Sequence, residues 1–204
     1  HAKKYGYTPR SVSAPRAVIN VTVDSGSSNT GSLTIPRGYT FLSNQIDNRA
    51  YSFVAIEDTT VSKTANNFVF ENVNIYEGQY VTYNYVHSES SNPKQIFDIR
   101  DVDIDTSTLQ VSVFPSTSNT DYTIYTLSTD ALNTSSNAEI YFLQEGQNGF
   151  YQIYFGDNVL GKQLTDGNIV RMSYLFTSGT SAYQANNFIL MDSISGYSNT
   201  ITQS

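Results

Sequence analysis

The chain has no cysteine and no tryptophan, only two histidines, and few charged side chains, which make up 14% of its 204 residues. Without cysteine there is no thiolate nucleophile, no disulfide, no redox pair and no cysteine-ligated zinc or iron–sulfur cluster. Its apolar runs are only a few residues long, far short of the roughly 18 residues that a transmembrane helix needs. We therefore expect no membrane partner and few of the usual metal or redox functions.

Polar and aromatic residues dominate instead. Ser, Thr and Asn together make up 67 residues, and 16 Tyr and 11 Phe accompany them. Ser, Thr and Asn compete with the helical backbone for hydrogen bonds, whereas Thr, Tyr and Phe suit a pleated surface, so the composition favours strands. Polar and apolar residues alternate from Ala17 onward, and turn clusters recur at intervals of about ten residues. The sequence predicts a mainly β protein of two β-rich units, of sandwich or meander type, with little helix.

The same alternation predicts where the strands and domains lie. Strands are expected at 17–24, 33–35, 39–41, 51–57, 67–76, 79–86, 95–99, 108–114, 122–127, 138–144, 150–155, 168–176 and 187–191. Short helices fit only 128–135 and the stretch after 180. We divide the chain into an extended basic arm (1–17), a first β-rich domain (18–92), a second β-rich domain (93–180) and a tail segment (181–204).

Charge is unevenly distributed along the chain. It has 11 basic and 18 acidic residues, a net charge of −7, yet residues 1–16 contain four basic residues and no acid. Two prolines favour an extended course for this arm, which is either a frayed end or a strap that docks on an acidic neighbour. The acidic remainder repels phosphates, so we expect no nucleic-acid partner. The candidate interface residues of the arm are Lys3, Lys4, Tyr5, Tyr7, Arg10 and Arg16.

One carboxylate cluster stands out, formed by Asp98, Asp101, Asp103 and Asp105. Residues 101–105 resemble the opening of a calcium loop, but Thr106 stands where that loop needs glycine and Ser112 where it needs glutamate. We therefore interpret 101–105 as a strand with its aspartates facing water and Val102 and Ile104 facing the core. Sequence spacing leaves open a carboxylate pair of the glycosidase type.

His87 is the histidine available inside the chain, and it follows a predicted strand. No G-x-S-x-G elbow accompanies it, so we interpret it as a solvated side chain and not as a catalytic base. The residues themselves thus predict no catalytic residue, no metal site, no cofactor and no small-molecule substrate.

The segment from Tyr151 to Tyr174 combines glycine-containing turns with a strand on either side. It reads Phe155-Gly156-Asp157-Asn158, then Gly161, Asp166-Gly167, Val170 and Tyr174. We expect the Asp157 carboxylate to bond amides of its own turn and not a ligand. The residues expected to form turns between strands 150–155 and 168–176 are Gly156, Asp157, Gly161 and Gly167.

This segment resembles the signature of baseplate J-like proteins of contractile injection machines, with Asn158 in place of a turn glycine. Residues 3–11 (KKYGYTPRS) are similar to a stretch of the wedge subunits that build the inner ring of T-even-type phage baseplates, and 33–41 (LTIPRGYTF) fit the strand pair of the same family. The resemblance spans residues 3–180, whereas 179–186 depart from the family's glycine-rich pattern. Family members are longer, so we expect this chain, which starts at His1, to be a piece of a larger protein.

The resemblance implies a structural protein and no enzyme: a baseplate wedge component of the virion tail, assembled in the host cytoplasm. It implies other wedge subunits as partners, a homodimer in the parent protein, and contacts in a ring around the tail hub. Surfaces rich in Tyr, Thr and Asn fit that role because they are buried at low desolvation cost. The alternative is a glycan-binding β module of a tail or adhesin protein, which the many Tyr and Asn favour and the missing tryptophan disfavours.

Overall fold

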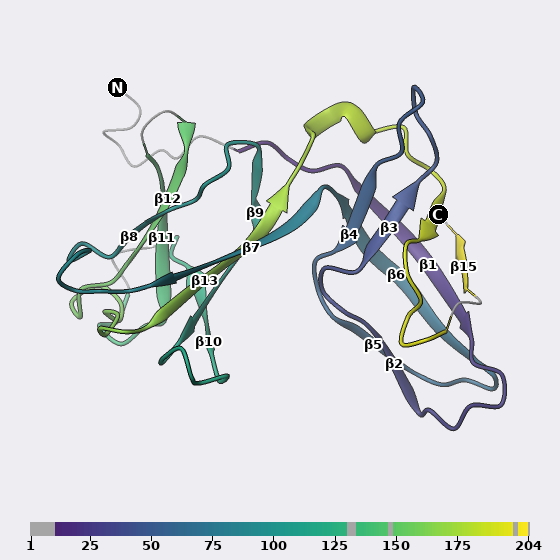
Figure 1. Ribbon diagram of the computed structural model, residues 1–204, viewed down its shortest axis with the longest axis horizontal. Helices are drawn as coiled ribbons and strands as arrows, with labels where there is room; N and C mark the ends of the chain where they lie inside the picture. The colour runs from purple at the N-terminus through teal and green to yellow at the C-terminus, as the bar shows by residue number, and fades with distance from the viewer. Residues whose placement is uncertain (1–10, 130–133, 147–148, 198–199, 204) are drawn as a thin grey trace. The chain divides into compact units, whose positions relative to one another are not determined.

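The computed structural model describes residues 11–129, 134–146, 149–197 and 200–203, and its regular secondary structure is almost entirely β-strand (Figure 1). A short 3-10 helix lies at Gly179–Ala182. Among the described residues, no helix is long and apolar enough to cross a membrane. The prediction of a mainly β chain of two β-rich units with little helix is confirmed.

The first sheet has six strands in the order β14-β3-β4-β6-β1-β15, with antiparallel pairing throughout. In that order they are Phe188–Leu190, Thr40–Ser43, Ser52–Ala55, Asn67–Glu77, Arg16–Asp24 and Thr200–Gln203. A separate pair, β2 (Ser32–Ile35) with β5 (Thr59–Ser62), accompanies it. Strand β5 reads TTVS, a polar run that hydrophobic alternation did not predict.

The second sheet has seven strands in the order β7-β13-β9-β10-β11-β12-β8. In that order they are Gln79–Val86, Ile169–Phe176, Ile104–Phe114, Thr123–Leu127, Ile140–Glu145, Tyr151–Phe155 and Ile96–Asp98. The hydroxyl of Tyr85 on one edge strand, β7, donates to the carbonyl oxygen of Asp98 on the other, β8, at 2.9 Å. Side chains thus bridge the two edges, and the sheet nearly closes into a barrel.

Strand β1 shows why alternation specifies these elements. Ile19, Val21 and Val23 are buried, while Asn20 between them is exposed, so one face of the strand belongs to the core. Opposite this point β6 carries a bulge at Asn72, whose φ is +55°, and the Asn72 N–H donates to Asn20 Oδ1 at 2.9 Å. Figure 1 shows β1 in purple beside β6.

Two hydrophobic cores lie under the two sheets. One includes Phe41, Phe53 and Phe68 of the six-stranded sheet, and the other includes Ile153 and Tyr174 of the seven-stranded sheet. Each core is dominated by fully buried aromatic and β-branched side chains, the residue types that suit a pleated surface.

The two compact units are each built from two stretches of the chain. Of the described residues, Ser11 and those from Val81 to Tyr174 belong to the seven-stranded unit, and those from Val12 to Tyr80 and from Leu175 onward belong to the six-stranded unit. The sequence placed a boundary near residue 92, because Asn92 and Pro93 signal a turn. In the structure that turn lies between β7 and β8, inside the seven-stranded unit. The chain passes between the units near the start of β7, after Tyr80, and near the end of β13, after Tyr174.

Candidate assembly interface

The basic arm is the first candidate interface. Lys3, Lys4, Tyr5, Tyr7 and Arg10 lie outside the described residues. Arg16, the sixth candidate, begins β1, is exposed, and donates from Nε to Asn74 Oδ1 at 2.9 Å and also from Nη2 to the same atom. Its guanidinium is therefore held against the neighbouring strand β6 of its own sheet.

The FGD turn, residues 156–161, follows β12 and is shaped by two glycines for different reasons. Gly161 has a φ of +83°, a left-handed conformation that favours glycine, as has Gly167 further on at +85°. Gly156 does not have a positive φ. A Cβ on Gly156 would lie 2.5 Å from the carbonyl oxygen of Leu160 and closer still to the backbone of Gly161, so the turn needs glycine there for close backbone approach.

Asp157 holds the FGD turn from within. Its Oδ1 accepts hydrogen bonds from the backbone N–H groups of Val159 and Leu160, each at 3.0 Å. These amides, that of Leu160 first, stabilise the carboxylate and lower its pKa below the ordinary value of 3.8. The carboxylate thus serves the conformation of its own backbone.

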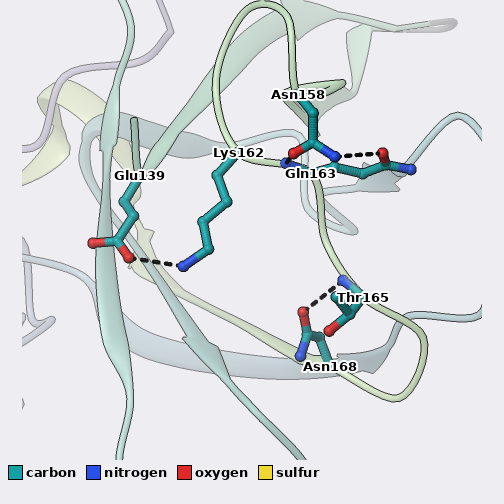
Figure 2. Close-up of polar contacts among 6 residues, drawn as sticks. All are labelled: Glu139, Asn158, Lys162, Gln163, Thr165 and Asn168. Atoms are coloured by element: carbon teal, nitrogen blue, oxygen red, sulfur yellow. Dashed lines mark hydrogen bonds and ion pairs between the residues drawn. The ribbon is translucent and has the colours of Figure 1, made fainter. Parts of the chain in front are cut away.

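Further polar contacts fix the turn and the loop that follows it, as Figure 2 shows. Asn158, with a φ of +65°, accepts at Oδ1 from the Gln163 N–H at 3.0 Å and donates from Nδ2 to Gln163 Oε1 at 3.1 Å. Lys162 forms an ion pair with Glu139 at 3.0 Å. Asn168 Oδ1 accepts from the Thr165 N–H at 2.9 Å and closes the turn around Gly167.

This rigid frame presents two apolar side chains to solvent. Val159 is 71% exposed and Leu160 is 41% exposed, although both are ordinary core residue types. Sequence reasoning treated the turn as purely structural and missed them; the signal was a Val-Leu pair flanked by turn residues. Two apolar side chains exposed on a fixed turn are suited to contact with another protein surface.

The acidic cluster does not form the predicted strand. Residues 102–103 are a bend, and β9 begins only at Ile104. The predicted facing holds for Ile104, which is buried, and is wrong for Val102, which is 44% exposed, and for Asp105, which is buried. Asp105 Oδ1 accepts from the N–H and the hydroxyl of Ser107, at 3.0 and 2.6 Å.

The other aspartates of the cluster have separate partners. Asp101 Oδ2 accepts from the Tyr174 hydroxyl at 2.6 Å, and Asp98 Oδ1 accepts from Gln152 at 2.6 Å. Burial first, and then the Asp101 carboxylate, raise the pKa of Tyr174. In the described part of the chain, no three His, Asp or Glu side chains gather as a metal ion would require.

His87 also differs from its prediction, because it is buried and not solvated. Its side chain is 2% exposed and its ring lies 6.2 Å from that of Phe97. Its backbone N–H donates to the Asn168 carbonyl at 2.7 Å, and its carbonyl accepts from the Gly167 N–H at 2.9 Å. The loop before β13 therefore lies against it, a tertiary contact that the sequence pattern around His87 does not show.

Two comparisons with known proteins show what the chain is similar to. Residues 14–78, all within the six-stranded unit, match the family described as baseplate wedge protein gp6, domain II. The chain is also 25% identical over 210 residues to baseplate wedge protein gp6 of Enterobacteria phage T4, a match that covers 95% of this chain and 30% of that protein. The chain thus spans less than a third of the length of this relative. These two matches confirm the predicted resemblance: the chain carries a domain of the baseplate wedge protein gp6 type.

Proposed function

We propose that this chain builds contacts between subunits in the baseplate of a contractile phage tail, both with copies of itself and with other wedge subunits around the tail hub. The observation that carries the proposal is the similarity of 95% of the chain to a protein named as a baseplate wedge protein. A structural component of a phage baseplate belongs to the virion tail. Assembly in the host cytoplasm and a homodimeric parent protein are parts of the same proposal.

The surface of the chain supports this role. Among the described residues, four large apolar side chains are each exposed by 62% or more, and they occur in both units. Charged side chains make up only 14% of the chain, so much of its surface is polar but uncharged. Polar uncharged side chains with apolar bodies are buried against a partner at low desolvation cost. The four exposed residues are Val86, Val159, Tyr183 and Ile189.

The basic arm is the proposed means of choosing a neighbour. Exposed ion pairs contribute only about 0.2–1 kcal/mol each, but charge complementarity steers register and specificity more than affinity. A deletion that reaches residue 16 is a poor test of the arm. Ala14 is buried, and the carbonyl of Pro15 accepts from the Glu77 N–H at 2.8 Å, so their loss would disturb the six-stranded unit itself.

The sharper variant replaces Lys3, Lys4 and Arg10 by serine in the full chain. Light scattering after size-exclusion chromatography measures its mass alone and with purified neighbouring wedge subunits. We expect the unchanged chain to form a complex with a wedge subunit, and the variant to bind it more weakly, most clearly at low salt.

The matched control removes three positive charges from the body of the chain, at Arg49, Lys63 and Lys94, and is expected to keep the complex. A chain that remains a monomer with every wedge subunit, with the arm intact, would overturn the proposed function. Specific binding on a glycan array would then favour the glycan-binding alternative.

A further inference from the structure

A pocket of about 460 Å³ opens on the seven-stranded unit, where β7, β9 and β13 meet the loop after β9. Its apolar lining includes Val86, Phe114, Tyr122 and Ile169. Val86 and Tyr122 are 64% and 55% exposed, whereas Phe114 and Ile169 are buried, so the rim of the pocket is apolar and faces solvent. We call it the Phe114 pocket.

One cation is fixed at the Phe114 pocket. The guanidinium of Arg171 lies 4.4 Å from the centre of the Phe114 ring, and its Nε donates to Asn84 Oδ1 at 2.9 Å. Within the described residues, no carboxylate forms an ion pair with Arg171. In a chain with a net charge of −7, a positioned cation without a carboxylate partner favours a ligand that brings one.

The FGD turn has the complementary chemistry. It presents Val159 and Leu160 to solvent beside the exposed carboxylate of Asp157. One oxygen of that carboxylate, Oδ1, is used by the turn itself, and Oδ2 points to no partner in the described part of the chain. Because the turn is held by its own hydrogen bonds, it loses little conformational entropy when it binds.

From this complementarity we infer that the FGD turn of one copy binds the Phe114 pocket of a second copy. Val159 and Leu160 contact the aromatic lining, and Asp157 faces Arg171. The inference rests on the proposed function, because it names the contact through which the chain associates with itself. A contact of two aliphatic side chains and one ion pair is small and weak in isolation, and repetition within a multi-subunit assembly strengthens it through effective concentration.

The test uses the full chain and two variants that change exposed side chains. The turn variant carries Val159→Ser and Leu160→Ser; the pocket variant carries Tyr122→Ser and Arg171→Glu. The control carries Val69→Ser, an aliphatic residue of the other unit that is 41% exposed, as Leu160 is. Circular dichroism checks that each variant is folded.

Sedimentation velocity from about 10 μM to about 1 mM, the range suited to a small interface, measures self-association. The unchanged chain and the control are expected to associate as the concentration rises. The dissociation constant for self-association of the turn variant and of the pocket variant is expected to be roughly tenfold higher or more. An equimolar mixture of the two variants is expected to recover association, because it keeps one intact turn and one intact pocket on different chains. Association that both variants retain, or a mixture that recovers nothing, would refute the inference.

A second measurement is independent of any substitution. In methyl and amide NMR spectra of the unchanged chain, concentration-dependent shifts are expected at Val159, Leu160, Ile169 and Tyr122. A concentration of about 1 mM corresponds to the dissociation constant of a weak protein complex. The inference is contradicted if shifts are confined to other residues or if no shift appears up to about 1 mM. Either result leaves the arm-dependent binding of wedge subunits unaffected, so failure of this contact is distinct from failure of the proposed function.

Discussion

Glu77 offers the sharpest test of how the six-stranded unit is held together. It ends β6 with its side chain 5% exposed, yet its carboxylate accepts three hydrogen bonds. Oε2 accepts from the Thr177 hydroxyl at 2.6 Å and from the Ser178 N–H at 3.0 Å, and Oε1 accepts from the Ser178 hydroxyl at 2.6 Å. The carboxylate therefore fixes the segment after β13 against the end of β6, two segments 100 residues apart.

The magnitude follows from what each substitution leaves behind. Hydrogen bonds to a charged group contribute about 1.5–3 kcal/mol each, against several kcal/mol for burying the carboxylate. Glu77→Ala leaves the Ser178 N–H without its acceptor, and we expect a loss of about 3 kcal/mol in the free energy of unfolding. Glu77→Gln keeps the volume and one acceptor oxygen, so we expect a loss of about 1–2 kcal/mol.

Chemical denaturation followed by circular dichroism measures both losses, and amide hydrogen exchange at Ser178 shows whether this segment opens. At this chain length a loss of about 3 kcal/mol corresponds to a fall in Tm of roughly 6–12 °C. The control is Glu71→Ala, on the same strand but exposed, which should change stability by less than about 0.5 kcal/mol. If Glu77→Ala is as stable as the Glu71 control, the three bonds do not hold this segment and the reasoning is wrong.

Three further predictions concern the seven-stranded unit. Gly156→Ala should lower the free energy of unfolding by about 3 kcal/mol or more in denaturant melts, because the added Cβ meets backbone atoms. The control Gly31→Ala, where a Cβ has open space and φ is not positive, should leave stability unchanged. Equal stability of the two variants would contradict the prediction. The pKa of Asp157, followed by carboxyl-carbon NMR, should lie below 3.8. The ionised carboxylate therefore stabilises the fold above pH 3.8, and this stabilisation is lost as the pH falls through the lowered pKa. A titration midpoint at or above 3.8 would contradict the prediction. Burial raises the pKa of Tyr141 to about 12, and burial with the Glu139 carboxylate raises that of Tyr125 to about 12. Both phenols ionise near pH 10 in an unfolded chain, so the stability gained by burying their neutral forms is complete below pH 10 and lost as the pH rises toward 12. An ultraviolet titration in which both phenols of the folded chain ionise near pH 10 would refute the prediction.

Local pattern in the sequence determined most of the strands and the nature of the FGD block. Ile19, Val21 and Val23 alternate with polar residues, and such alternation by itself requires a strand with one buried face. Asp157 sits two and three residues before the amides that it bonds, so its contact depends only on nearby sequence. Both inferences hold because the interacting groups are neighbours along the chain.

Tertiary structure alone decided which sheet each strand joins and which polar groups are buried. Glu77-Gly78 and Asp166-Gly167 are both acid-glycine pairs, yet Gly78, with a φ of +134°, lies where β6 continues into β7 of the other sheet, whereas Gly167 lies in a tight turn. A Cβ on Gly78 would lie 3.2 Å from the carbonyl carbon of Phe176, almost 100 residues away. His87 and Asp105 show the same limit, since each owes its burial to how the chain packs in three dimensions. Alternation reports which face of a strand is apolar, but not which distant segment covers it.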